Sequence, residues 1–108
     1  MVSTVQESDL VHIINQLFEL EKKTLLMDNA TSLQRPLRRI QQSMDRMGYR
    51  WENPLGDKFE DSRTDYEANI VGTLEQALFI REVIKPIIRH IADGKARLVQ
   101  RGIVIVDV

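Results

Sequence analysis

The chain ends on a run of β-branched residues, which limits its fold more than any other feature. Residues 103–106 read Ile-Val-Ile-Val, and Val108 is the last residue. A bare strand of this composition promotes aggregation because its backbone groups stay free to pair with another chain. The run therefore predicts a strand that is covered by a neighbour.

A tight turn upstream supplies that neighbour. Asp93-Gly94 is typical of a two-residue hairpin turn of type I′, so residues 83–91 are expected to pair with the chain end. The pattern predicts one long strand over 95–108, exposed near the turn and buried on both faces near its end. This strand closes the β core.

The segment 73–92 is compatible with two structures. Thr73 and Gln76 resemble a helix capping box, and isoleucines follow at helical spacing. Pro86 and the density of β-branched residues favour a strand, with Pro86 at an edge or bulge. We favour the strand, and residues 66–72 predict another short one before it.

The first fifty residues have a helical pattern. Ser8 is the expected N-cap of a first helix, and Asn29 is a possible C-cap residue. A second helix is expected after Thr31 or Ser32, with Pro36 in about its first turn, where the missing N–H costs little. Gly48 is expected to end this helix.

Each of these helices has an apolar seam that is too narrow to bury itself. The second seam steps by four and three residues, as in a heptad. Pairing of the helical hairpin with a second copy would give a four-helix bundle. We predict a homodimer held by Leu10, Ile14, Leu17, Leu33, Leu37, Ile40, Met44 and Met47.

The expected fold class is therefore α+β, with two regions. Residues 1–50 form a helical dimerisation region, a hairpin that makes a dimeric four-helix bundle. Residues 51–108 form a linker and a small all-β head. Turn residues interrupt the linker, and Trp51, Leu55 and Phe59 are expected to tie it to the core.

Composition excludes several classes of site and location. There is no cysteine, and the net charge is −1, so disulfides, thiolate ligands and a general affinity for polyanions or acidic membranes are not expected. No apolar run is long enough for a membrane span, and the start of the chain lacks the features of a signal peptide. We expect a cytoplasmic protein.

No residue pattern indicates an enzyme, a cofactor or a metal site. His12 and His90 are isolated, and neither a nucleophile elbow nor a phosphate loop is present. The acidic residues Asp57, Glu60, Asp61 and Asp65 lack the spacing of a calcium loop. Nucleic-acid binding is not expected, because aromatic residues for base stacking are nearly absent beside the basic residues. These basic residues are Arg81, Lys85, Arg89, Arg97 and Arg101.

The order of these parts resembles the GrpE family, the nucleotide exchange factors of DnaK-type chaperones. The family's turn after its second bundle helix is similar to a stretch of this sequence. The matching residues are Gly48 after the helix and then Pro54, Leu55, Gly56 and Phe59. Glu67 and Ala68 match its first head strand, where Tyr66 stands in place of a histidine. The family's closing hairpin is in register with four features of this sequence, where Pro86 stands in place of a glycine. These features are Lys85, Gly94, Arg97 and the run 103–106. The family's long N-terminal stalk is not in this sequence.

The resemblance implies a mechanical function and also favours a strand in 73–92. A head would bind the nucleotide-binding domain of a DnaK-type chaperone and favour its open state, from which ADP leaves. The implied contact residues are Tyr66, Asn69, Lys85, Arg89 and Arg97. The alternative is a dimeric interaction or adaptor module that has this fold and another partner.

Overall fold

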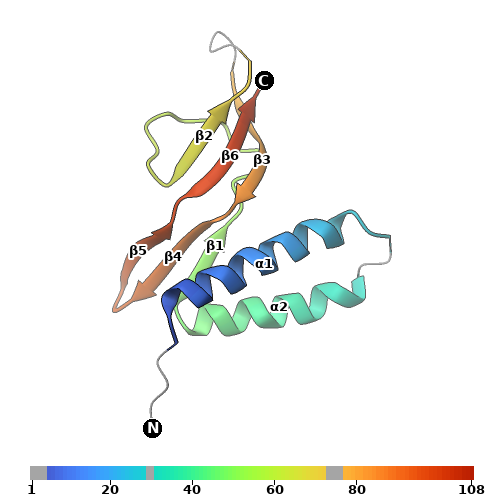
Figure 1. The fold of residues 1–108 in the computed structure, drawn as a ribbon, viewed down its shortest axis with the longest axis vertical. Coiled ribbons are helices and arrows are strands. Elements are labelled where there is room, and N and C mark those ends of the chain that lie inside the picture. The colour runs from blue at the N-terminus through green and yellow to red at the C-terminus, as the bar shows by residue number, and fades with distance from the viewer. Residues whose placement is uncertain (1–4, 29–30, 73–76) are drawn as a thin grey trace.

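The computed structural model describes residues 5–28, 31–72 and 77–108 and has an α+β fold (Figure 1). Two helices, α1 (Glu7–Leu25) and α2 (Thr31–Arg46), form a hairpin. Six strands follow them: β1 (Tyr49–Glu52), β2 (Tyr66–Ile70), β3 (Phe79–Lys85), β4 (Ile87–Ala92), β5 (Lys95–Gln100) and β6 (Gly102–Asp107). They make two three-stranded sheets, in the orders β1-β4-β5 and β2-β6-β3.

One long bent hairpin belongs to both sheets. Its arms are β3-β4 and β5-β6, and it turns at Asp93 and Gly94, which both have positive φ, as the type I′ prediction required. The arms bend where Pro86 separates β3 from β4 and Arg101 separates β5 from β6. Register shifts lie on both sides of Pro86, but Pro86 itself lies in the break between β3 and β4 and not in a bulge. The long strand predicted over 95–108 is therefore two strands.

The end of the chain lies in the middle of its sheet. β6 pairs with β3 antiparallel and with β2 parallel, so its backbone has a partner on both sides. Gly102, Val104 and Val106 are buried, whereas Ile103 and Ile105 are half-buried. The prediction that both faces are buried holds for one face only, because the core covers one side of this sheet.

Two buried clusters join the helices to the sheets. One contains Phe18 of α1 among residues of β2, β3, β4 and β6, and the other joins Ile14 and Met44 to Tyr49 and Ile88. Trp51 packs against both clusters. Burial of each such side chain stabilises the fold by roughly 1.5–3 kcal/mol. The expected boundary at residue 50, between a helical region and a β region, therefore falls inside β1. Both clusters contain residues from each side of this boundary.

Several expected boundaries are wrong. α1 begins at Glu7 after Gln6, not after Ser8, because Tyr49 and Arg97 hold the Glu7 carboxylate and extend the helix backward. Pro36 is the sixth residue of α2, beyond its first turn. Asn29 and the Thr73–Gln76 box lie outside the described residues. The prediction of a strand in 73–92 is confirmed over 79–92, which form β3 and β4.

The linker contains a strand that its sequence did not predict. Tyr49–Glu52 is β1, which pairs with β4 at the edge of its sheet. Trp51 and Phe59 pack against the core as expected. Leu55 does not, because 55% of it is exposed.

Candidate partner-binding surface

Charged side chains hold the loop before β2 against the other sheet. Arg63 donates two hydrogen bonds to the Asp65 carboxylate, at 2.9 and 2.7 Å, and Arg89 of β4 donates a third at 2.6 Å. The Arg63 guanidinium also lies 4.8 Å from the centre of the Tyr66 ring. These arginines, Arg63 first, lower the pKa of the Asp65 carboxyl. The loop is therefore anchored to β4 by an ionised carboxylate.

Arg101 holds the same loop from the break between β5 and β6. It donates to the carbonyl oxygens of Thr64 and Tyr66, each at 3.0 Å, and pairs with Glu67 at 3.0 Å. The bend of the hairpin and the start of β2 are thus joined by one side chain.

A second charged cluster joins α1 to the hairpin. Arg97 of β5 binds both carboxylate oxygens of Glu7, at 3.1 and 2.6 Å, and the Tyr49 hydroxyl donates to Glu7 at 3.0 Å. The hydrogen bonds from Arg97 and then Tyr49 lower the pKa of Glu7 to about 2. Burial, and then the bond to Glu7, raises the pKa of Tyr49.

The predicted chaperone-contact residues fall into three groups. Tyr66 is only 3% exposed, and its hydroxyl bonds the backbone of Glu60, so it is a core residue. Arg89 and Arg97 are used in the ion pairs with Asp65 and Glu7. Asn69 and Lys85 are exposed, and among the described residues their side chains have no hydrogen bond or ion pair. These last two are the predicted contacts that stay available to a partner.

The predicted dimerisation residues divide between core and surface. Ile14, Leu17, Leu37 and Met44 are buried within the chain, and Leu10 is half-buried. These five pack within one protomer because the hairpin has to cover its own seam and the sheets. Leu33, Ile40 and Met47 remain exposed.

The exposed residues of α2 continue on α1. Leu33, Ile40 and Met47 recur every seven residues, and so do Ile13 and Leu20, which are 45% and 47% exposed. We call these five residues the heptad face. The seven-residue spacing of Ile13 and Leu20 is present in the sequence. Only burial in the folded protein distinguishes these two exposed residues from the core positions of α1.

The heptad face borders the seam between the helices. Ile13 precedes the buried Leu17 by four residues, and Leu20 precedes the buried Thr24 by four. The same step leads from Leu33 to Leu37 and from Ile40 to Met44. Residues four apart are neighbours on a helix, so both rows lie beside the contact between α1 and α2.

The other candidate residues have structural surroundings. His12 is exposed, and the His90 ring lies 4.5 Å from the Tyr49 ring. Arg81 donates to the main-chain oxygen of Val108 at 3.0 Å. No three histidine or acidic side chains in the described ranges are grouped to hold a metal ion. Neither described helix is long and apolar enough to cross a membrane.

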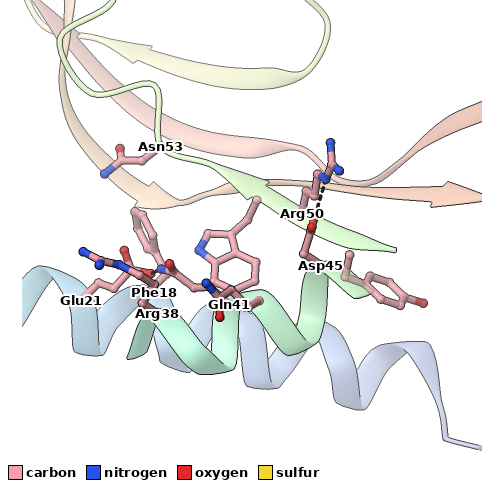
Figure 2. Close-up of a pocket in the computed structure, with 10 residues that line it drawn as sticks. Phe18, Glu21, Arg38, Gln41, Asp45, Arg50 and Asn53 are labelled. Atoms are coloured by element: carbon pink, nitrogen blue, oxygen red, sulfur yellow. Dashed lines mark hydrogen bonds and ion pairs between the residues drawn. The ribbon is translucent and has the colours of Figure 1, made fainter. Parts of the chain in front are cut away.

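A pocket of about 400 Å³ lies between the helical hairpin and β1 (Figure 2). Phe18, Glu21 and Arg38 lie together at one end, and the Asp45–Arg50 ion pair lies at the other. Tyr49 and Trp51 of β1 also line it. The sequence pattern did not predict this pocket, because its residues come from three elements.

Comparison of the chain with protein-family models, curated proteins and solved structures gave no match.

Proposed function

We propose that this protein is a homodimeric, GrpE-like nucleotide exchange factor for a DnaK-type chaperone. The observation that carries the proposal is the heptad face, an apolar face on a helical hairpin whose other side is packed against a two-sheet β unit. This arrangement supports the parts that the family resemblance implies, a dimerising hairpin and a β head.

Charge also supports pairing of two copies. α1 contains four acidic and two basic residues, whereas α2 contains four arginines and one acidic residue. In a two-fold dimer the same surface of each copy faces the other. Placing α1 beside the partner's α2 would bring helices of opposite net charge together.

The head would act by binding without chemistry of its own. A ligand that binds the open form of the chaperone's nucleotide-binding domain better than the closed form shifts the population toward open. ADP then leaves faster. Asn69 and Lys85 supply exposed polar contacts on two strands of the sheet that contains β6, and the ion pairs of Asp65 keep the adjoining loop in place.

The test is release of a fluorescent ADP analogue from the chaperone of the same organism. We expect the protein to accelerate release. Lys85→Glu should raise the half-maximal concentration about tenfold, a change of about 1.4 kcal/mol, because it reverses the charge of an interface contact. Lys23→Glu, the same charge change at an exposed site on α1, is the control and should have no such effect. No acceleration at saturating protein would refute the exchange function.

The second candidate is a dimeric adaptor module with another partner. The observation that favours it is the burial of Tyr66 and the use of Arg89 and Arg97 within the chain, which removes three of the implied chaperone contacts. A pull-down from native lysate separates the two functions. A DnaK-like ATPase among the captured proteins supports the exchange factor, and its absence supports the adaptor.

A further inference from the structure

Helix α2 carries three arginines in a line along its solvent-facing side. Arg35, Arg39 and Arg46 are separated by four and seven residues, so they lie within about 40° of one another around the helix axis. All three are exposed, and we call them the arginine row. Their Cα atoms follow one another at about 6 and 10.5 Å along the axis, given a rise of about 1.5 Å per residue. The row is therefore a straight line of positive charge on a rigid element.

No carboxylate pairs with the arginine row within the described part of the chain. Asp45 is the only acidic residue between positions 29 and 50, and it is paired with Arg50. The side-chain contact within the row is neutral, because Arg46 donates a hydrogen bond to the Ser43 hydroxyl at 3.0 Å. The net charge of −1 belongs to the whole chain, whereas this side of α2 is locally positive.

We propose that the arginine row binds the phosphate backbone of a nucleic-acid duplex, without preference for a base sequence. Arginine supplies all of the positive charge of α2, and its planar guanidinium binds a phosphate through two parallel hydrogen bonds. Each strand of a duplex presents one phosphate about every 3.4 Å along the axis. A straight row of guanidinium groups can follow such a regular line of anions.

The composition of α2 selects the duplex over other polyanions. α2 has no aromatic residue, so it offers no ring on which the bases of a single strand could stack. A helix that lies on an acidic membrane buries apolar side chains in it, whereas Gln42 and Ser43, between Arg39 and Arg46, are polar. The row is therefore suited to a polar surface of evenly spaced phosphates.

The arginine row is separate from the surfaces of the proposed function. On α2 the heptad face lies about 120° around the helix axis from the row, and the exposed contacts Asn69 and Lys85 are on strands. The fourth arginine of α2, Arg38, is not part of the row, because it lines the pocket beside β1 at the same end as Glu21 (Figure 2). Duplex binding can therefore hold or fail independently of nucleotide exchange.

The test is the salt dependence of binding to a fluorescently labelled DNA duplex, measured by anisotropy between about 50 and 200 mM salt. Three phosphate contacts in each copy of the chain predict a slope of about −2.7 for the logarithm of the binding constant against the logarithm of the salt concentration. Arg39→Gln removes one contact of three, so the slope should fall by about a third and the affinity at the lowest salt should fall several-fold. A dimer would double the slope but leave this fraction unchanged.

Arg81→Gln is the matched control, because it makes the same charge change at an exposed residue of β3, outside the helical hairpin. It should leave the slope unchanged. Glutamine has nearly the helix propensity of arginine, so Arg39→Gln should keep the melting temperature of the unchanged protein.

Three results with the duplex would overturn the proposal: no saturable binding at the lowest salt, equal slopes for Arg39→Gln and Arg81→Gln, or tighter binding to a single strand of the same length. Two further probes test the phosphate backbone against other anions. Displacement of the duplex by polyglutamate at equal charge concentration would assign the arginine row to an acidic protein. Equal binding to vesicles that contain phosphatidylserine would assign it to a membrane. Either result would also overturn the proposal.

Discussion

At the scale of single residues, Gly48 joins the helices to the sheets. It has φ +89° and follows α2 after one intervening residue, Met47. Its carbonyl accepts a hydrogen bond from the Ile91 N–H at 2.8 Å, and a Cβ on Gly48 would lie 2.5 Å from the Ile91 carbonyl oxygen. Both the backbone angle and the close approach therefore require glycine.

Gly48→Ala should destabilise the protein more than the matched change Gly56→Ala. Gly56 has nearly the same φ, +87°, but nothing lies within 4 Å of an added Cβ. The control Gly56→Ala should lower the free energy of unfolding by about 1 kcal/mol, because of the left-handed backbone alone. Gly48→Ala should cost about 3 kcal/mol, because the clash with Ile91 adds to that strain. Urea unfolding measures both, and equal losses would contradict the close-approach argument.

Glu7 should make stability depend on pH in acid. In the folded state the pKa of the Glu7 carboxyl is lowered from 4.5 to about 2. This carboxylate therefore binds a proton less readily in the folded protein than in the unfolded chain. Its contribution is present above pH 4.5 and is lost as the pH falls toward 2. The stability difference between the unchanged protein and Glu7→Gln should narrow between pH 6 and pH 3 in urea unfolding.

The control for Glu7 is Asp9→Asn, in the same turn of α1. Asp9 is exposed and has no ion pair within the described residues. Asp9→Asn removes an acid from the same turn and leaves the contacts of Glu7 with Arg97 and Tyr49 in place. A Glu7→Gln difference that stays constant down to pH 3 would contradict the role of the Arg97 pair.

At the scale of elements, β6 is the strand on which one whole sheet depends. It is the central strand between β2 and β3, and Val104 and Val106 are fully buried. Truncation after Gly102 should remove the near-UV circular dichroism of the head and its cooperative melting, because two strands lose their partner. Removal of Val108 alone, which is 50% exposed, should have little effect. A native-like near-UV spectrum after truncation would refute this dependence.

The elements differ in how far local sequence predicts them. The Asp93-Gly94 turn is predicted well because positive φ at both residues is a local preference. β1 is not predicted, because four residues with no clear alternation form a strand only by pairing with β4. One arm of the hairpin bends at Pro86 and the other bends at Arg101. Only the bend at Pro86 is indicated by the local sequence.

At the scale of the whole molecule, the protein is elongated. Its Cα radius of gyration is 15.8 Å and its extents are 57 × 37 × 21 Å, whereas a compact domain of this length has about 13 Å. The far end of the helical hairpin projects away from the strands (Figure 1). Leu25 and Leu26 at this end are 74% and 87% exposed. Apolar surface of this kind marks interaction sites.

A charge placed in the heptad face should prevent dimer formation without unfolding the protomer. Ile40→Glu puts a carboxylate at a site that is already 41% exposed. We expect a dimer for the unchanged protein at micromolar concentration and a monomer for Ile40→Glu, by sedimentation velocity. Leu98→Glu, at a site on β5 that is 40% exposed, is the control and should stay dimeric. A monomeric unchanged protein would refute the dimer proposal.

The sequence by itself determined the α+β class, the two helices, the hairpin turn and the need to cover the final strand. These follow from periodicity, turn chemistry and β-branched composition, which act between near neighbours. Tertiary structure alone decided which apolar residues are core and which are surface. Leu37 and Leu33 are alike in sequence, but Leu37 is buried and Leu33 is 40% exposed. The same holds for Tyr66 and for the pocket beside β1, because burial depends on segments far apart in the chain that meet only in the folded protein.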